Sequence, residues 1–493
     1  MQANVFTLAF SATNQYLYSG DTNETILKYD LTRLGDSSSG PGVPESAFSA
    51  HSENVRAITC HPELDAVFIS TGYVPDYVFF TVIVLMHTLP PFPHIASDDG
   101  KILLHDARAG HTRQAALQHG AEVTSAQFHP AVPHVFATAD ARGGVCLRDT
   151  RMAFGPEAGR RTGGVVQTYV TALSKTSVSH LARPEATSVT FDRTGSKLAV
   201  TFLSYYPTIY SLADPLPLAV CSARTRPDGS PIPAGERTYT NVCTMKVSVR
   251  TDTAYPPSSG YRRPFNVHYR LMISYVQHGS FGGPGLDSDE YYSAGSDDFC
   301  AYVWKVPGVE ELRLARETVS ANRWKSLGEE RIAFTAFPTK DRHIPVDLST
   351  PLARLAGHKS IVNTALFHPH LPLLLTAGVE RHIFIHSPTP NGPCLDEMEP
   401  TPTEVRQLPG PSLHSHRIMI RALTSGLAMD DDDASTIALF DEIFRSEGES
   451  DVFDTRRWNP DSDEEPEEHD SSDDDDHDDS DERSLDMELD AFL

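Results

Sequence analysis

The sequence lacks the short motifs that mark most catalytic and cofactor sites. It contains no G-x-x-x-x-G-K-S/T phosphate loop, no G-x-S-x-G nucleophile turn and no H-E-x-x-H zinc motif. Its six cysteines include no C-x-x-C pair, so no zinc-type spacing is present. The adjacent His105 and Asp106 cannot form a catalytic relay, because neighbouring strand residues point to opposite faces. We therefore expect a protein that is not an enzyme, with no catalytic residue, metal or cofactor.

The chain also lacks a recognisable leader or membrane span. Its start has no charged region followed by an apolar one. The most apolar run, Tyr77 to Leu89, has 13 residues, whereas about 20 are needed to cross a bilayer. Isolated cysteines in such a chain favour buried free thiols in a reducing compartment. We expect an intracellular protein of the nucleus, the cytoplasm or both, with no membrane partner.

Positive charge is scarce, and the deficit is concentrated at one end. The 493 residues carry 67 acidic and 41 basic side chains, a net charge of -26. Residues 421–493 alone hold 28 acidic and 5 basic residues, a net of -23, so the rest is nearly neutral. This balance excludes a general polyanion binder, and we expect no direct nucleic-acid partner. A net-neutral globular body precedes an acidic tail that we expect to be disordered.

A repeat of about 40 residues dominates the rest of the chain. The clearest copies combine a His-containing loop with period-two strands, and turns such as His-Pro, Asp-Gly or Ser-Gly separate the strands. The clearest copies are residues 355–387 and 118–151, and a third begins at 50–51 and ends at 104–106. Less complete copies are 5–30, 187–212 and one split between 239–246 and 291–304. Six copies are therefore recognisable.

Up to about residue 388, this pattern resembles the WD40 blades of a β-propeller. The resemblance implies an all-β fold, usually of seven blades. In this family a loop His, a turn Asp and a strand Trp form a buried network within each blade. The matching residues here are the loop histidines His51, His119 and His358, the turn aspartates Asp99 and Asp298, and the strand tryptophan Trp304.

Three blades depart from that pattern at the strand tryptophan. His105, Arg148 and His386 stand in its place. These substitutions leave the strand pattern intact but put the internal networks of their blades in doubt.

Four stretches resemble a narrower group, the WD40 substrate receptors of cullin-4 RING ubiquitin ligases. They are TNVCTMK at 240–246, SAGSDDFCAYVWKVP at 293–307, the repeat at 357–388 and ALFDEIFR at 438–445. Receptors of this group bind a propeller-shaped adaptor through blades that end in Trp-Asp-x-Arg. The resemblance implies a non-enzymatic receptor that brings an unknown protein substrate to the ligase.

Two consecutive blades keep the Asp and the Arg of that ending. Asp106 and Arg108 follow one strand, and Asp149 and Arg151 follow the equivalent strand of the next copy. An exposed guanidinium restrained by an Asp is a natural anchor for a partner's carboxylate. Taken alone, each pair fits equally well as an ion pair that merely closes its turn. Its occurrence in adjacent blades favours adaptor binding at these four residues.

Two segments interrupt the repeat. Without residues 71–95, the number of residues from the loop His to the final Arg equals that in the next copy. Without residues 247–277, a later copy becomes continuous. We consider two origins, translated introns or genuine insertions such as a partner-binding loop. The first copy also enters a blade directly, so we expect one blade to be missing upstream.

After the propeller, 389–434 is expected to be a linker and 435–446 a short amphipathic helix. We expect this helix to pack on the propeller rather than to act as an independent docking motif. Residues 447–493 form the acidic tail. Two further functions stay open: a WD40 scaffold in another intracellular complex, and a chromatin binder whose tail contacts histones or other basic proteins.

Overall fold

The computed structural model describes most of the repeat region and part of the chain beyond it. The described residues are 5–21, 25–33, 43–49, 51, 54–73, 100–109, 113–155, 162–233, 247–250, 268–271, 278–283, 289–380, 382–389, 404–410, 433–447 and 452–453. They lie in one compact unit, residues 1–453, whereas 454–493 form a separate unit outside the described residues. The predicted acidic tail therefore lies almost wholly outside them.

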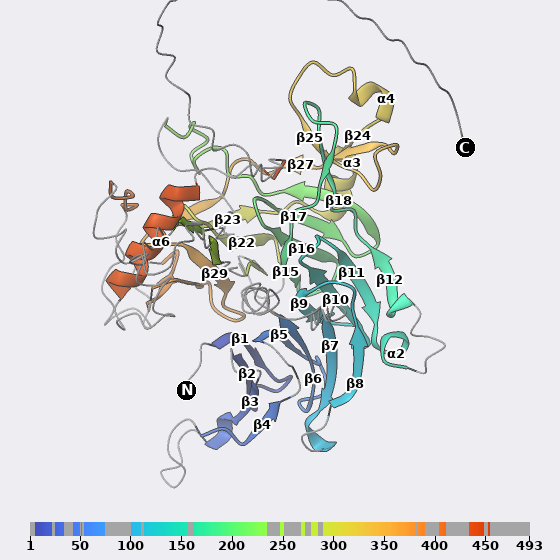
Figure 1. The fold of residues 1–493 in the computed structure, drawn as a ribbon, viewed down its shortest axis with the longest axis vertical. Helices are drawn as coiled ribbons and strands as arrows, with labels where there is room; N and C mark the ends of the chain where they lie inside the picture. Colours follow the sequence, from blue (N-terminus) through green and yellow to red (C-terminus); the bar gives the residue numbers. More distant parts are fainter. Residues whose placement is uncertain are drawn as a thin grey trace, which may run out of the picture. The chain divides into compact units, whose positions relative to one another are not determined.

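Six antiparallel sheets follow the predicted repeats, and we call them blades 1 to 6 (Figure 1). Of the fifth repeat, the part predicted at 239–246 lies outside the described residues, and the first described strand of its sheet is Ser280–Gly282. Blade 1 contains β1 (Val5–Phe10), β2 (Tyr16–Asp21), β3 (Thr25–Asp30) and β4 (Ser46–Ser49). Blade 2 contains β5 (Asn54–Cys60), β6 (Val67–Tyr73), β7 (Lys101–Asp106) and β8 (Arg113–Gln118). Blade 3 contains β9 (Val123–Phe128), β10 (Val135–Asp140), β11 (Val145–Asp149) and β12 (Val165–Thr168).

The later blades carry the larger departures from a simple repeat. Blade 4 contains β15 (Ala186–Phe191), β16 (Lys197–Phe202), β17 (Tyr205–Ser211) and β18 (Asp214–Val220). Blade 5 contains β21 (Ser280–Gly282), β22 (Tyr291–Gly295), β23 (Ala301–Lys305) and β28 (Ala353–Leu355). Blade 6 contains β29 (Val362–Phe367), β30 (Leu374–Gly378) and β31 (Ile383–His386). The fold is the WD40 β-propeller that the sequence predicts.

Polar side chains join the first strands of successive blades. The Thr59 hydroxyl in blade 2 accepts a hydrogen bond from the Phe128 N–H in blade 3 at 3.0 Å. The Ser280 hydroxyl in blade 5 accepts one from the Phe367 N–H in blade 6 at 2.8 Å. Such bonds satisfy backbone donors at the inner edge of each sheet, where burial would otherwise make them costly. They fix each blade against its neighbour.

Strand direction gives the blades two sides. We call the strands of each blade a to d in chain order. Because they are antiparallel, the a–b and c–d turns lie at one end, the a–b side, and the b–c turns at the other, the b–c side. Two backbone bonds mark the a–b side: Ala107 N–H donates to Ala66 O, and Thr150 N–H to His134 O, both at 2.8 Å.

The sequence does not predict an accessory sheet built from two distant segments. Its strands are β13 (Leu173–Lys175), β14 (Leu181–Ala182), β24 (Glu317–Val319), β25 (Ile332–Phe334) and β26 (Arg342–Ile344). The first two follow blade 3, and the other three interrupt blade 5 between β23 and β28. The same interruption contains α3 (Val309–Ala315), α4 (Ala321–Trp324) and β27 (Val346–Asp347), which pairs with β18 of blade 4.

A buried arginine fastens the two segments of this sheet together. Arg342 of β26 is 5% exposed, and it donates to the Ser174 hydroxyl of β13 at 3.1 Å and to Pro338 O at 2.9 Å. The Phe334 ring packs at 5.7 Å from the Tyr205 ring of blade 4. The accessory sheet thus shares an apolar core with that blade.

The predicted C-terminal helix is α6 (Asp433–Glu447), slightly longer than expected. Its Asp441 is 3% exposed, and the Asp441 carboxylate accepts hydrogen bonds from both terminal nitrogens of Arg406, at 2.5 and 2.9 Å. The Arg406 Nε donates to Lys359 O of the loop before blade 6 at 2.7 Å. The Phe444 ring meets Phe299 of the b–c turn in blade 5 at 6.2 Å. The helix therefore packs on the b–c side of blades 5 and 6.

Little of the two interrupting segments is described. Of 247–277, only β19 (Val247–Arg250) and β20 (His268–Leu271) are described, and they pair with each other. Of 71–95, only 71–73 belong to the described residues, as the end of β6. Both proposed origins of these two segments, translated introns and genuine insertions, stay predictions. Among the described residues, no helix is long and apolar enough to cross a membrane.

Candidate functional site

The ends of β7 and β11 carry two Asp–Arg pairs with the same geometry. In blade 2, the Arg108 Nε donates to Asp106 Oδ1 at 2.9 Å and its Nη2 to Oδ2 at 2.6 Å. The Arg108 backbone N–H also donates to Oδ1, at 3.0 Å. This last bond closes the tight turn after the strand, so one carboxylate fixes both the main chain and the side chain of the arginine.

Blade 3 repeats the arrangement almost atom for atom. The Arg151 Nε donates to Asp149 Oδ1 at 3.0 Å and its Nη2 to Oδ2 at 2.6 Å. The Arg151 N–H donates to Oδ1 at 2.9 Å, which makes Asp149 the N-cap of the one-turn α2 (Thr150–Ala153). We call the two pairs the Asp–Arg forks. Because both lie in c–d connections of neighbouring blades, both face the a–b side.

Each fork presents an oriented cation to solvent. The Arg108 side chain is 67% exposed and that of Arg151 69%, whereas their aspartates are 21% and 10% exposed. The aspartate carboxylate accepts hydrogen bonds from two of the five guanidinium N–H groups, one on Nε and one on Nη2. The other three N–H donors lie on the outer edge of the guanidinium. In the described part of the chain, that edge meets no other acceptor. Such an edge matches a carboxylate or a pair of carbonyl oxygens.

The charges of each fork stabilise one another. Hydrogen bonds from Arg108 lower the pKa of Asp106, and those from Arg151 lower the pKa of Asp149. The same bonds raise the pKa of each arginine. Both forks therefore keep their charge over the whole physiological range.

Behind the fork of blade 2 lies a hydrogen-bonded network without tryptophan. His105, one residue before Asp106, points inward and is 1% exposed. Its Nε2 lies 2.8 Å from the Ser70 hydroxyl of β6, which lies 2.8 Å from Nε2 of the loop histidine His51. The His105 ring also stacks on Phe68 at 4.6 Å. The histidine thus takes the place of the expected tryptophan. Asp99 lies outside the described residues.

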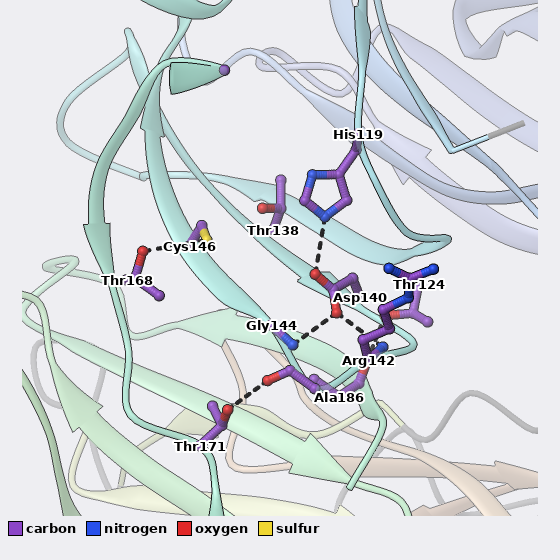
Figure 2. Close-up of polar contacts among 12 residues, drawn as sticks. His119, Thr124, Thr138, Asp140, Arg142, Gly144, Cys146, Thr168, Thr171 and Ala186 are labelled. Carbon is purple, nitrogen blue, oxygen red and sulfur yellow. Dashed lines mark hydrogen bonds and ion pairs between the residues drawn. The ribbon is translucent and has the colours of Figure 1, made fainter. Parts of the chain in front are cut away.

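Blade 3 builds its network around a buried arginine, Arg148, which is 2% exposed. The Arg148 Nε donates to the Thr138 hydroxyl at 3.0 Å, and its Nη2 lies 3.1 Å from Nδ1 of His119. The other ring nitrogen of His119 lies 2.9 Å from Asp140 Oδ2, a bond drawn in Figure 2. Asp140 in turn accepts from the Gly144 N–H at 2.7 Å. The turn, the loop and the third strand are therefore tied together.

Blade 6 uses two histidines and a glutamate. The His386 Nε2 lies 2.9 Å from the Thr376 hydroxyl, which lies 2.8 Å from Nε2 of His358. The His358 Nδ1 lies 2.9 Å from Glu380 Oε1, an atom that also accepts from the Lys359 N–H at 2.8 Å. An ionised carboxylate only accepts, so the His358 Nδ1 donates to Glu380.

The electrostatics of blade 6 follow from that chain of bonds. Burial raises the pKa of Glu380, but the bonds from His358 and the Lys359 N–H outweigh it, and the net pKa is lowered. Burial, and to a smaller extent the nearby His358, lowers the pKa of His386 to about 4. At neutral pH the blade therefore contains one ionised carboxylate and an uncharged His386.

Blade 5 keeps the predicted tryptophan. Trp304 is fully buried, and its ring stacks on those of Tyr302 at 5.7 Å and Tyr292 at 6.3 Å. The predicted turn aspartate, Asp298, is also fully buried, and it accepts from the Tyr302 hydroxyl at 2.5 Å and from Arg354 at 3.1 Å. In this blade the turn aspartate is hydrogen-bonded to Tyr302, the second residue of β23, and to Arg354 of β28.

The three substitutions at the tryptophan position thus leave their blades with hydrogen-bonded networks, contrary to the doubt raised by the sequence. Sequence reasoning also missed two turn acids, Asp140 and Glu380, as members of these networks. Both acids lie in the turn before the third strand of their blade, and that position could have identified them from the sequence. Glu380, however, is not the residue type that the family pattern specifies there. The cysteines of the described residues are free thiols, and burial raises the pKa of Cys60 to about 12. Among the described residues no cluster suited to a metal ion occurs.

Comparison with known proteins agrees with the fold and with the narrower resemblance. The family described as WD domain, G-beta repeat matches residues 349–387, which include blade 6. DDB1- and CUL4-associated factor 5 of mouse is 25% identical over 470 residues, which cover 94% of this chain and 35% of that protein. The human protein of the same name is 24% identical over 94% of this chain and 36% of its own length. This chain is a WD40-repeat protein similar to these factors, and it spans about a third of their length.

Proposed function

We propose that this WD40-repeat protein is a substrate receptor of a cullin-4 RING ubiquitin ligase. In this role its a–b side binds the propeller-type adaptor, and another surface holds the protein to be modified. Two lines of support meet here: the similarity along nearly the whole chain to factors named for DDB1 and CUL4, and the paired Asp–Arg forks. The protein itself does no chemistry in this proposal, and it acts inside the cell by holding its partners together.

The observation that carries the proposal is the duplication of the fork. A turn can be closed by its aspartate alone, since an Asp side chain caps the backbone whatever residue comes next. Nothing in the turn requires an arginine whose side chain is two-thirds exposed, yet both blades have one. Two equally oriented guanidinium edges on neighbouring blades form a two-point anchor. Exposed ion pairs of this kind contribute little to stability, so they are available for a partner.

Co-purification of the tagged chain from cells tests the proposal. The wild-type chain should bring down the adaptor and the cullin. The double variant Arg108→Ala/Arg151→Ala should lose both while it remains folded. Arg313→Ala is the matched control, because Arg313 is also exposed, 56%, and paired with an acid, but lies on α3. Undiminished capture by the double variant would remove the forks from the interface.

A scaffold role in another assembly, and a chromatin role through the acidic tail, remain alternative proposals. Co-purification separates the first, because such a scaffold would bring down neither adaptor nor cullin. For the second, deletion of residues 459–493 should weaken binding to histones, and the loss should be largest at low salt because the attraction is electrostatic.

A further inference from the structure

A pocket of about 330 Å³ opens between the a–b turns of blades 4, 5 and 6, and we call it the a–b pocket. Three phenylalanines line it, one from strand a of each of these blades: Phe191, Phe281 and Phe367. Residues of the three turns form its rim, where Leu371 is 49% exposed. The volume is at the lower end of the range for small-ligand sites, about 300–1,000 Å³.

The pocket exists because blade 5 has a glycine where other blades have a histidine. The hydrogen bonds from Thr59 and Ser280 to the next blade align strand a of blade 2 with that of blade 5. In blades 2 and 3 the histidine after strand a packs on the phenylalanine of the next blade, with ring distances of 5.4 Å for His61–Phe128 and 5.1 Å for His129–Phe191. The equivalent residue of blade 5 is Gly282, at which a Cβ would collide with the Phe367 ring. Phe367 therefore stays in the wall of an open pocket.

The rim of the a–b pocket carries more positive than negative charge. Arg193 is 48% exposed, and among the described residues its guanidinium has no hydrogen-bond acceptor, since Asp289 Oδ1 lies 4.0 Å from its Nε. The Asp289 carboxylate is 8% exposed and accepts from the Arg193 backbone N–H at 2.5 Å. The Lys197 ammonium donates to Asp289 O at 2.8 Å and lies 5.7 Å from the centre of the Phe281 ring. One buried carboxylate thus accompanies two cations, which favours a ligand with a negative charge.

A row of contacting turns leads from the Asp–Arg forks to the pocket. Thr150, next to the fork of blade 3, donates through its hydroxyl to His134 O in the a–b turn of that blade at 3.2 Å. At the start of the same turn, the His129 Nε2 lies 3.2 Å from Gly195 O, in the a–b turn of blade 4. That turn also contains Arg193 of the rim. A partner that lies over both forks and this row of turns would reach the pocket.

The forks by themselves offer charged contacts only. Charged groups at an interface steer association and select the partner more than they raise affinity. Most of the binding energy at an interface comes from a few anchor side chains that fill well-packed pockets. The a–b pocket offers the apolar contact that the forks lack.

We propose that the a–b pocket is a second anchor for the partner that the forks bind. It receives one apolar side chain from a segment of that partner, and a carboxylate beside this side chain pairs with Arg193. In the proposed function this partner is the propeller-type adaptor. The inference therefore rests on that function, and adds to it the contact that supplies apolar binding energy.

The affinity of the purified chain for purified adaptor, measured by titration calorimetry, tests this. Leu371→Ala shortens an exposed side chain of the rim and should weaken binding about tenfold. Leu371→Asp should weaken it further, because its carboxylate would repel that of the partner. Ile383→Ala is the matched control, because Ile383 is an aliphatic residue of the same blade, 66% exposed, at the b–c end of β31. It should bind like the wild type.

A change of charge tests the contact with Arg193. Arg193→Ala should weaken adaptor binding severalfold, and the loss should be larger at low salt, where the attraction between the two charges is least screened. Arg313→Ala, which removes another half-exposed arginine, is the control and should leave the affinity unchanged.

The outcomes separate this inference from the proposed function. If the wild-type chain binds the adaptor and Leu371→Asp binds it equally well, the pocket is not an anchor and the forks remain. If the wild-type chain does not bind the adaptor at all, the proposed function fails and this inference fails with it.

Hydrogen exchange of the wild-type chain covers the case in which a variant does not fold. Saturating adaptor should slow exchange at the amides of residues 193–197 and 368–373, which belong to the turns around the pocket. Exchange in both turns that does not change at saturation would overturn the proposal.

Discussion

Blade 6 should lose stability in mild acid because of one partly buried histidine, His386. His386 has a pKa of about 4 in the folded chain, against an ordinary value of 6.5. Below pH 6.5 the unfolded chain takes up a proton that the folded chain refuses, so the stability present above that pH is lost as the pH falls towards 4. At about 1.4 kcal/mol for each pH unit, the loss between pH 7 and pH 5 is about 2 kcal/mol.

The matched variant is His386→Phe, which keeps an aromatic ring and removes the titrating group. It gives up the hydrogen bond to Thr376 at every pH, at a cost of about 1 kcal/mol. Some acid sensitivity remains, because burial and the nearby Arg56 also lower the pKa of His278 to about 4. The prediction therefore concerns the difference between the two proteins, which should narrow or reverse as the pH falls.

Native-state hydrogen exchange of the β30 and β31 amides is the suitable assay, because it reports the opening of blade 6 separately from the other blades. The free energy of opening should fall by about 2 kcal/mol more in the wild type than in His386→Phe between pH 7 and pH 5. The same dependence on pH in both proteins would refute the reasoning, and would mean that His386 can be protonated within the folded blade.

Two further predictions concern the core of blade 5 and the attachment of α6. Trp304→Ala should cost about 3–5 kcal/mol in urea unfolding, because the ring is fully buried between two tyrosines, whereas the exposed Phe337→Ala should change stability by less than about 0.5 kcal/mol. Asp441→Ala should cost about 2–3 kcal/mol by leaving Arg406 without its carboxylate, and limited proteolysis should then cut near α6 sooner. Glu310→Ala, which breaks an exposed ion pair, should leave both readouts unchanged.

The blades could be predicted from the sequence because each repeats its own local signals. Period-two strands recur in all six copies, a common succession of turns recurs in the clearest of them, and in blades 1, 3, 4 and 6 neighbouring strands are close in sequence. The Asp–Arg forks were also within reach, since an arginine two residues after an aspartate can bond to it across a single turn. Whether a fork binds a partner is a separate question that local pattern does not answer.

The accessory sheet could not be predicted in the same way. Its strands have two or three residues, too few to show a period, and β13 pairs with β25 across more than 150 residues, with Leu173 opposite Phe334. The networks of blades 2, 3 and 6 were hidden for another reason: His105, Arg148 and His386 can all bond to a hydroxyl of the second strand, but only the geometry shows that they do.

The central claim is that the two forks anchor an adaptor, and its most direct test is the affinity of purified chain for purified adaptor. Wild type should be compared with Arg108→Ala, Arg151→Ala, the double variant and the control Arg313→Ala. A buried anchor arginine contributes about 2 kcal/mol, so each single variant should bind about 30-fold more weakly, and the double variant should lose more than either. Equal affinity of the double variant, the control and the wild type would contradict the account.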